Sequence, residues 1–243
     1  MEYRRLDFWQ YFIDTSGDYN NTGDARFKIE YKDVPYTYKD RVCHANYEVH
    51  YEEDRNVIQI NFEETNGKKD WFVNFMFVEK YYSSFDYKGK KITLRVHNGW
   101  ARMYKAMKHQ VRKEVKALKN EHPDAFIEII GWSLGSGQAM LCSQDLFYNF
   151  GYKSFLYTYG SVNPFKTNIF NRKVIRGYLR DCCEAVYNFC EPNDIVTYQV
   201  PRLFGFIKFK RINVGRKFNF IGLFNPMKYH TQYDTKSFYE KIK

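Results

Sequence analysis

The sequence has no apolar run approaching the ~18 residues that a membrane-spanning helix requires. Its first 19 residues, MEYRRLDFWQYFIDTSGDY, also lack the sustained apolar core and the small-residue cleavage site of a secretory signal. We therefore expect a protein that neither crosses a membrane nor is exported through a signal peptide. The cytoplasm is the expected location, and peripheral contact with membranes is compatible with it.

Cysteine is scarce, and the number of cysteines is odd. No two of them form a C-x-x-C pair, and no histidine cluster lies near them, so the sequence indicates neither a zinc site nor a full disulfide framework. We expect a reducing compartment, no bound metal and no cofactor. The five are Cys43, Cys142, Cys182, Cys183 and Cys190.

The composition is otherwise that of a globular protein, with 44% hydrophobic and 27% charged residues. We expect a single domain over residues 1–243, because one α/β domain commonly reaches this length. The formal net charge of +10 favours an anionic partner. No recognised DNA- or RNA-binding motif occurs, so we expect no nucleic acid and keep an anionic membrane or lipid surface as the candidate.

The first third of the chain predicts a hairpin and a short helix. Residues 1–40 are polar, aromatic and rich in turn signals, and we interpret them as a loosely organised lead-in. Residues 47–51 alternate in polarity and are followed, after a charged turn, by the apolar run 57–62, which predicts a hairpin. Apolar side chains in residues 68–82 recur at helical spacing. They are Trp71, Phe72, Phe75 and Met76.

The remainder predicts an α/β fold with a mostly parallel central sheet and helices on both faces. A helical pattern over residues 99–120 precedes a strand at 125–130. A second helix at 134–150 precedes strands at 154–160 and 185–190. Alternating strands and helices imply right-handed crossovers between parallel strands.

The sharpest chemical signal is the sequence Gly131-Trp132-Ser133-Leu134-Gly135. It is a G-x-S-x-G motif between a predicted strand and a predicted helix, which is the context of a nucleophilic serine at a strained turn in an α/β-hydrolase fold. Small residues flank the serine because larger side chains would collide where the strand meets the helix. Ser133 is therefore the candidate nucleophile.

A serine nucleophile needs a base and an acid, which follow it in the order acid, then histidine, in this fold. His230 is the only histidine after Ser133. Among the later aspartates, Asp145 lies within the helix, Asp181 precedes a strand, and Asp234 follows the histidine. Asp194 remains as the candidate acid, because it follows the strand at 185–190, where catalytic groups gather at the carboxyl ends of parallel strands.

The sequence resembles the class 3 lipase family, whose best-known members are fungal triacylglycerol lipases. The resemblance covers roughly residues 57–235. Five segments match motifs of the family in the same order: FEETNGKKDW (62–71), VHNGW (96–100), GWSLG (131–135), LYTYG (156–160) and NDIVTYQVP (193–201).

The resemblance also implies further site residues. Thr65 takes the oxyanion-hole position, and the backbone N–H of Leu134 supplies the second donor; each such donor is typically worth ~2.7–4 kcal/mol. Residues 68–77, which carry the four apolar side chains named above, correspond to a lid over the acyl pocket. In the family, His97 is structural. Three positions depart from the family pattern: Glu63-Glu64 replaces Arg-Gly, Trp132 replaces His, and Ser136 stands where Gly is common.

These observations predict a serine carboxylic-ester hydrolase that acts on acyl lipids. A phospholipase or a short-chain esterase is the nearest alternative, because the same triad serves all three. A lipase-fold binding protein with impaired catalysis is the alternative that Glu63-Glu64 raises. Two basic stretches are most simply solvated surface, with contact to anionic headgroups as the other interpretation. They are Lys105, Lys108, Arg112, Lys113, Lys116 and Lys119, and Lys208, Lys210, Arg211, Arg216 and Lys217.

Overall fold

The structure is a computed structural model. It describes residues 31–38, 41–62, 79–168, 170–198, 206–207, 209–214, 229–230 and 233. Its strands are β1 (Lys32–Tyr38), β2 (Arg41–Glu52), β3 (Val57–Phe62), β4 (Glu79–Tyr87), β5 (Lys90–His97), β6 (Phe126–Trp132), β7 (Ser154–Tyr159), β8 (Phe165–Lys166), β9 (Cys183–Cys190) and β10 (Ile212–Asn213). Its helices are α3 (Asn98–Glu121), α4 (Leu134–Phe150) and α5 (Arg172–Asp181), with short 3-10 turns η1 (Glu53–Arg55) and η2 (Ile195–Tyr198).

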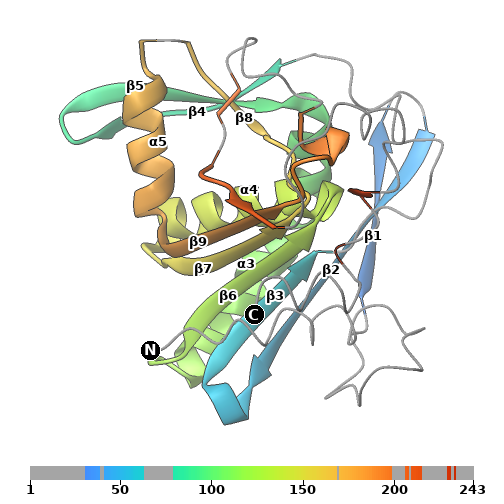
Figure 1. The fold of residues 1–243 in the computed structure, drawn as a ribbon. Coiled ribbons are helices and arrows are strands. Elements are labelled where there is room, and N and C mark those ends of the chain that lie inside the picture. Colours follow the sequence, from blue (N-terminus) through green and yellow to red (C-terminus); the bar gives the residue numbers. More distant parts are fainter. Residues whose placement is uncertain are drawn as a thin grey trace.

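Seven strands form the large sheet, in the order β1-β2-β3-β6-β7-β9-β10 (Figure 1). From β3 onward all neighbours are parallel, while β1 and β2 are antiparallel additions at one edge. Every residue of β3 is buried, as expected for a parallel strand covered on both faces. The predicted α/β fold with a mostly parallel sheet and the predicted hairpin of β2 and β3 are confirmed.

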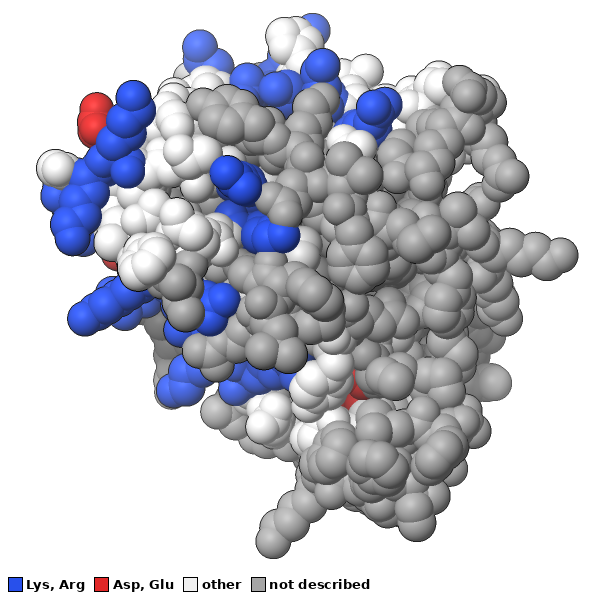
Figure 2. Space-filling view, turned by 90° about the horizontal axis from the view of Figure 1, so that it is seen from above, with Lys and Arg blue, Asp and Glu red and all other residues white. Residues whose placement is uncertain are grey.

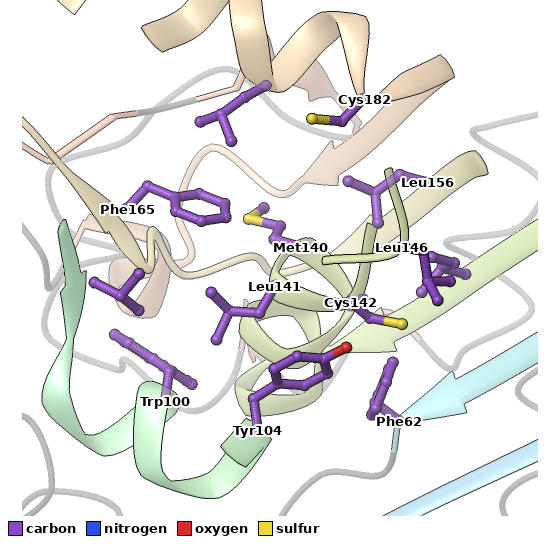
Figure 3. Packing of buried hydrophobic residues seen from close by; sticks show 14 of the residues in the cluster. Phe62, Trp100, Tyr104, Met140, Leu141, Cys142, Leu146, Leu156, Phe165 and Cys182 are labelled. Carbon is purple, nitrogen blue, oxygen red and sulfur yellow. The ribbon is translucent and has the colours of Figure 1, made fainter. Parts of the chain in front are cut away.

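The main core lies between the sheet and the described helices. In α3, Trp100, Tyr104 and Met107 are buried in this core, which agrees with the helical pattern of the sequence. Figure 3 shows Trp100 and Tyr104 beside Leu141 of α4. Residues 134–146 of α4 are all buried, so this helix runs through the interior. A smaller apolar cluster, which includes Tyr159 and Tyr233, lies apart from the main core.

A second sheet of three strands, β4-β5-β8, lies at the top of Figure 1, and α5 contacts both β5 and β9. It corrects the prediction of a helix over residues 68–82, because residues 79–82 belong to β4. Lys88 and Gly89 link β4 to β5 with positive φ at both positions, the geometry of a two-residue hairpin turn. The rest of that predicted helix lies outside the described residues.

The predicted lead-in over residues 1–40 is wrong for its last part. Residues 32–38 form β1, which pairs with β2 along its whole length. Pro35 stands within β1, and proline is tolerated there because an edge strand needs no donor on its open side. The strand was not predicted because it contains a proline and is flanked by polar residues. Residues 1–30 lie outside the described residues, and the single-domain interpretation stays a prediction.

Candidate active site

Ser133 lies at the sharp turn between β6 and α4. Its backbone has φ 52° and ψ −117°, a strained conformation for a residue other than glycine. The N–H of Ser133 donates to the carbonyl of Tyr159 at 2.9 Å, which ties the turn to β7. A Cβ on Gly131 would lie 2.3 Å from the carbonyl oxygen of Gly135, so the first glycine of the motif is required by space. The turn holds the serine at the carboxyl end of the sheet.

The structure brings His230 between Ser133 and Asp194. The Nε2 atom of His230 lies 2.7 Å from Oγ of Ser133, and its Nδ1 atom lies 2.9 Å from Oδ2 of Asp194. The carboxylate can only accept, so Nδ1 donates to Asp194 and Nε2 is left to accept from the serine hydroxyl. The three side chains are 0–1% exposed. Two hydrogen bonds thus connect a strained serine to a buried carboxylate.

Asp194 is held by the backbone as well as by His230. It follows β9, and its Oδ1 accepts from the N–H of Val196 at 2.9 Å at the start of η2. The other aspartates serve elsewhere. Asp145 accepts from Arg112 at 2.7 Å, and Asp181 accepts from Lys88 at 2.7 Å, a hydrogen bond that lowers the pKa of this carboxyl. Asp234 lies outside the described residues.

Tyr233 is a site residue that the sequence did not indicate. Its hydroxyl donates to Oδ2 of Asp194 at 2.7 Å and accepts from the N–H of Glu191 at 2.8 Å. Burial, and then the charge of Asp194, raises the pKa of the Tyr233 phenol well above its usual value, so the group stays a neutral donor. The only sequence signal for Tyr233 is its position three residues after His230. That position does not reveal its hydrogen bond to Asp194, which lies 39 residues earlier in the chain.

Gly160 has no side chain, which leaves room for Tyr233, Asp194 and His230 to pack together. It follows β7 with φ 51°, a conformation that favours glycine. A Cβ there would lie 2.9 Å from the ring of Tyr233, 3.0 Å from Oδ2 of Asp194 and 3.1 Å from Cε1 of His230. The last residue of the LYTYG segment is therefore a glycine because the acid and the histidine pack against its backbone.

Of the two predicted oxyanion-hole residues, only Leu134 lies within the described residues. Leu134 is the first residue of α4, where backbone N–H groups have no partner within the helix and the helix dipole favours negative charge. Thr65, Glu63 and Glu64 lie outside the described residues, as do the predicted lid residues Trp71, Phe72, Phe75 and Met76. The oxyanion and lid assignments therefore stay predictions.

His97 has a structural role in the described part of the site. Its Nδ1 accepts from the N–H of Gly99 at 3.2 Å and caps α3, and its ring packs against Trp100. Within the described residues, no group of three His, Cys, Asp or Glu side chains is arranged to hold a metal ion. No helix in this part of the chain is long and apolar enough to cross a membrane. The expected cytoplasmic location stays a prediction.

A family model described as Lipase (class 3) matches residues 59–204, more than half of the chain. The chain belongs to the class 3 lipase family. This confirms the resemblance that the five sequence segments indicated. The strained Ser133 and the buried Asp194 belong to two of those segments, GWSLG and NDIVTYQVP.

Solved lipases resemble this member of the class 3 lipase family in fold. The native Rhizomucor miehei lipase in complex with its propeptide has a TM-score of 0.62 and 19% identity, covering 86% of this chain and 67% of that one. The Rhizomucor miehei triacylglyceride lipase has a TM-score of 0.57 and 20% identity, covering 76% and 66%. The mono- and diacylglycerol lipase from Aspergillus oryzae has a TM-score of 0.58 and 18% identity, covering 76% and 64%.

These similarities show that the chain has the α/β-hydrolase fold. The chain spans about half to two thirds of the length of the solved lipases that it matches, from 52% to 67%.

Proposed function

We propose that this protein is a serine carboxylic-ester hydrolase that acts on acyl lipids. The observation that carries the proposal is the pair of hydrogen bonds from His230 to Ser133 and to Asp194. A nucleophile bonded to a base, which is in turn bonded to an orienting carboxylate, is the arrangement that activates a serine. The strain at Ser133 supports the same conclusion, because strained backbone at a buried polar cluster is typical of active sites.

The proposed mechanism follows from the atoms in contact. Oγ of Ser133 attacks the acyl carbonyl while Nε2 of His230 takes its proton, and Asp194 stabilises the resulting imidazolium. The N–H of Leu134 and, by the family resemblance, Thr65 stabilise the oxyanion. The alcohol leaves with the proton of His230. Water, activated by the same histidine, then hydrolyses the acyl-enzyme and regenerates Ser133.

The substrate class is proposed from the relatives. One solved triacylglycerol lipase, which has 21% identity and a TM-score of 0.59, has a catalytic centre formed by a serine protease triad. The Aspergillus oryzae relative is a mono- and diacylglycerol lipase. We therefore place acylglycerols first among substrates. Phospholipids and short-chain esters remain the alternatives because the same triad hydrolyses all of them.

The test is hydrolysis of a substrate series by the purified chain. We expect fatty acid release from a triacylglycerol emulsion and turnover of soluble p-nitrophenyl butyrate. Faster release from phosphatidylcholine than from triacylglycerol would favour a phospholipase. No turnover of any ester would overturn the proposal and favour a lipase-fold binding protein.

Tyr233→Phe tests the support of the acid. The variant keeps the ring that packs beside Gly160 but removes the donor to Asp194 and the acceptor of the Glu191 N–H. Hydrogen bonds to charged groups contribute about 1.5–3 kcal/mol, so we expect kcat on the soluble ester to fall about tenfold or more with KM unchanged. A fallen thermal midpoint with unchanged kcat would instead indicate a purely structural tyrosine.

Ser133 is fully buried, so an ester can reach it only after part of the surrounding chain moves. We propose that the predicted lid is that part. Trp71→Ser combined with Phe75→Ser should retain folding and hydrolysis of a soluble ester while activity on emulsions and vesicles is lost. An equal loss on both substrates, with a lowered melting temperature, would identify an ordinary core helix, because each buried aromatic lost costs ~3–5 kcal/mol.

A further inference from the structure

Positive charge gathers on one described surface. We call it the basic surface and define it as residues 84–97, α5 with residues 165–168 and 170–171 before it, and residues 209–213. It contains eleven Lys and Arg residues and only two acidic ones, Asp86 and Asp181. Figure 2 shows Lys and Arg spread over the described part of this face, with little red among them. The cations are Lys88, Lys90, Lys91, Arg95, Lys166, Arg172, Lys173, Arg176, Arg180, Lys210 and Arg211.

The elements of the basic surface are tied to one another. The β4–β5 turn contacts the end of α5 through an ion pair of Lys88 with Asp181 at 2.7 Å. Strand β8 pairs with β5, and the N–H of Ile207 donates to the carbonyl of Phe165 at 2.9 Å. The cations therefore belong to one connected part of the fold.

The basic surface extends to the edge of the sheet that carries the active site. Strand β10, which belongs to the basic surface, pairs with the last two residues of β9 through Ile212 and Asn213. Arg211 donates to the carbonyl of Thr197, three residues after Asp194. Ser133 and Asp194 follow β6 and β9 at the same edge.

Exposed apolar side chains accompany the cations. Phe170, immediately before α5, is 89% exposed and stands among Lys166, Arg172 and Lys173 in the sequence. Ile212 and Tyr198 are each 39% exposed. Single exposed apolar residues are normal, but aromatic side chains among lysines and arginines are typical of surfaces that bind the membrane interface.

We propose that the basic surface docks onto an anionic lipid surface, with Phe170 entering the headgroup layer. The inference rests on the proposed function, because the part of the basic surface at Arg211 adjoins the segment that carries Asp194, where a lipid ester would react. Each Lys or Arg near an anionic leaflet strengthens binding several-fold, and the apolar ring adds to it by leaving water. The exposed Phe170 favours a lipid surface over a polynucleotide, which offers phosphates but no apolar layer.

The experiment measures binding of the Ser133→Ala protein to sucrose-loaded vesicles by co-sedimentation. This variant leaves the lipid intact, so binding is read without turnover. We expect binding to vesicles that contain phosphatidylserine, weaker binding at higher salt, and little binding to pure phosphatidylcholine. Equal binding to both vesicle types, or none to either, would overturn the proposal.

Charge reversal on the basic surface localises the contact. The test variant replaces exposed cations by Glu at Lys90, Lys91, Lys173 and Arg180. The control variant changes the net charge equally by replacing exposed lysines with Glu at Lys105, Lys113, Lys116 and Lys153, on α3 and after α4. We expect at least a tenfold loss of affinity for the test variant and a smaller loss for the control. Equal losses would show that net charge, not this surface, sets binding.

Phe170→Ser tests insertion, with Val42→Ser on β2 as its control because Val42 is 70% exposed and lies outside the basic surface. We expect Phe170→Ser to weaken binding severalfold and Val42→Ser to leave it unchanged.

Binding of a fluorescent RNA duplex tests the alternative partner. If the protein bound the duplex more tightly than the anionic vesicles, and the charge-reversal variant lost this binding, the surface would be assigned to nucleic acid instead. The same variants are also made with Ser133 restored, and their hydrolysis of the soluble ester is measured. This separates membrane docking from the proposed ester hydrolysis, because a protein that binds vesicles without hydrolysing the ester contradicts only the proposed function.

Discussion

Ser133→Ala should abolish ester hydrolysis while leaving the protein folded. Removing the nucleophile of a serine hydrolase costs roughly 10⁶-fold in kcat, because no other group can form the acyl-enzyme. Alanine is smaller than serine and fits the same turn, and the bond from the backbone N–H of residue 133 to the carbonyl of Tyr159 remains. The measurement is kcat on p-nitrophenyl butyrate together with the thermal unfolding midpoint.

The matched control for this variant is Ser143→Ala in α4, the helix that follows Ser133. Ser143 is buried and its hydroxyl contacts Ser154 at 2.8 Å, away from His230. This substitution should lower the free energy of unfolding by about 1 kcal/mol and leave kcat close to that of the unsubstituted protein. Undiminished hydrolysis by Ser133→Ala would show that the chemistry takes place elsewhere.

Asp194→Asn should lower kcat by about 10⁴-fold, the loss seen when a triad aspartate becomes asparagine in a serine protease. The asparagine amide can donate to Nδ1 of His230, which then favours the tautomer with its proton on Nε2. In that tautomer Nε2 no longer accepts the proton of Ser133, although the side chains keep their places. Asp194 is thus needed because it accepts the hydrogen bond from Nδ1 of His230, as well as for its negative charge.

Two other aspartates serve as controls for this prediction. Asp181→Asn should leave turnover unchanged, because Asp181 contacts Lys88 and Tyr87 at the β4–β5 turn. Asp145→Asn should lower stability instead, because it removes the charge that faces Arg112 in the interior. If Asp181→Asn proved to be the variant that loses activity, the choice of Asp194 as the acid would be wrong.

Helices α3 and α4 were predictable because their signals are local, whereas α5 was not predicted. Helix α4 spans the residues that the sequence predicted, since it begins directly after the serine turn and ends at Gly151, which has φ 72°. Helix α3 likewise follows its apolar stripe to within a residue or two at each end. The β4–β5 hairpin was missed because its turn is Lys88-Gly89, a weaker signal than the usual Asn-Gly or Asp-Gly.

The site was predictable only where the fold fixes the order of its parts. Ser133 is marked by its own motif, and chain order then selects His230 and Asp194. Tyr233 and Gly160 could not be found in this way, because their roles depend on contacts between distant segments. A tyrosine after a histidine and a glycine after a strand are common, and only the packing around Asp194 gives them meaning.

The most direct measurement is covalent labelling with a fluorophosphonate, followed by intact mass and peptide mapping. The reagent reacts with a serine only when a base has activated it, so it tests the relay of Ser133, His230 and Asp194 without assuming a substrate. We predict one adduct, on Ser133, that forms much more slowly in Asp194→Asn and is absent in Ser133→Ala. An unlabelled protein, or an adduct on another serine, would contradict the account.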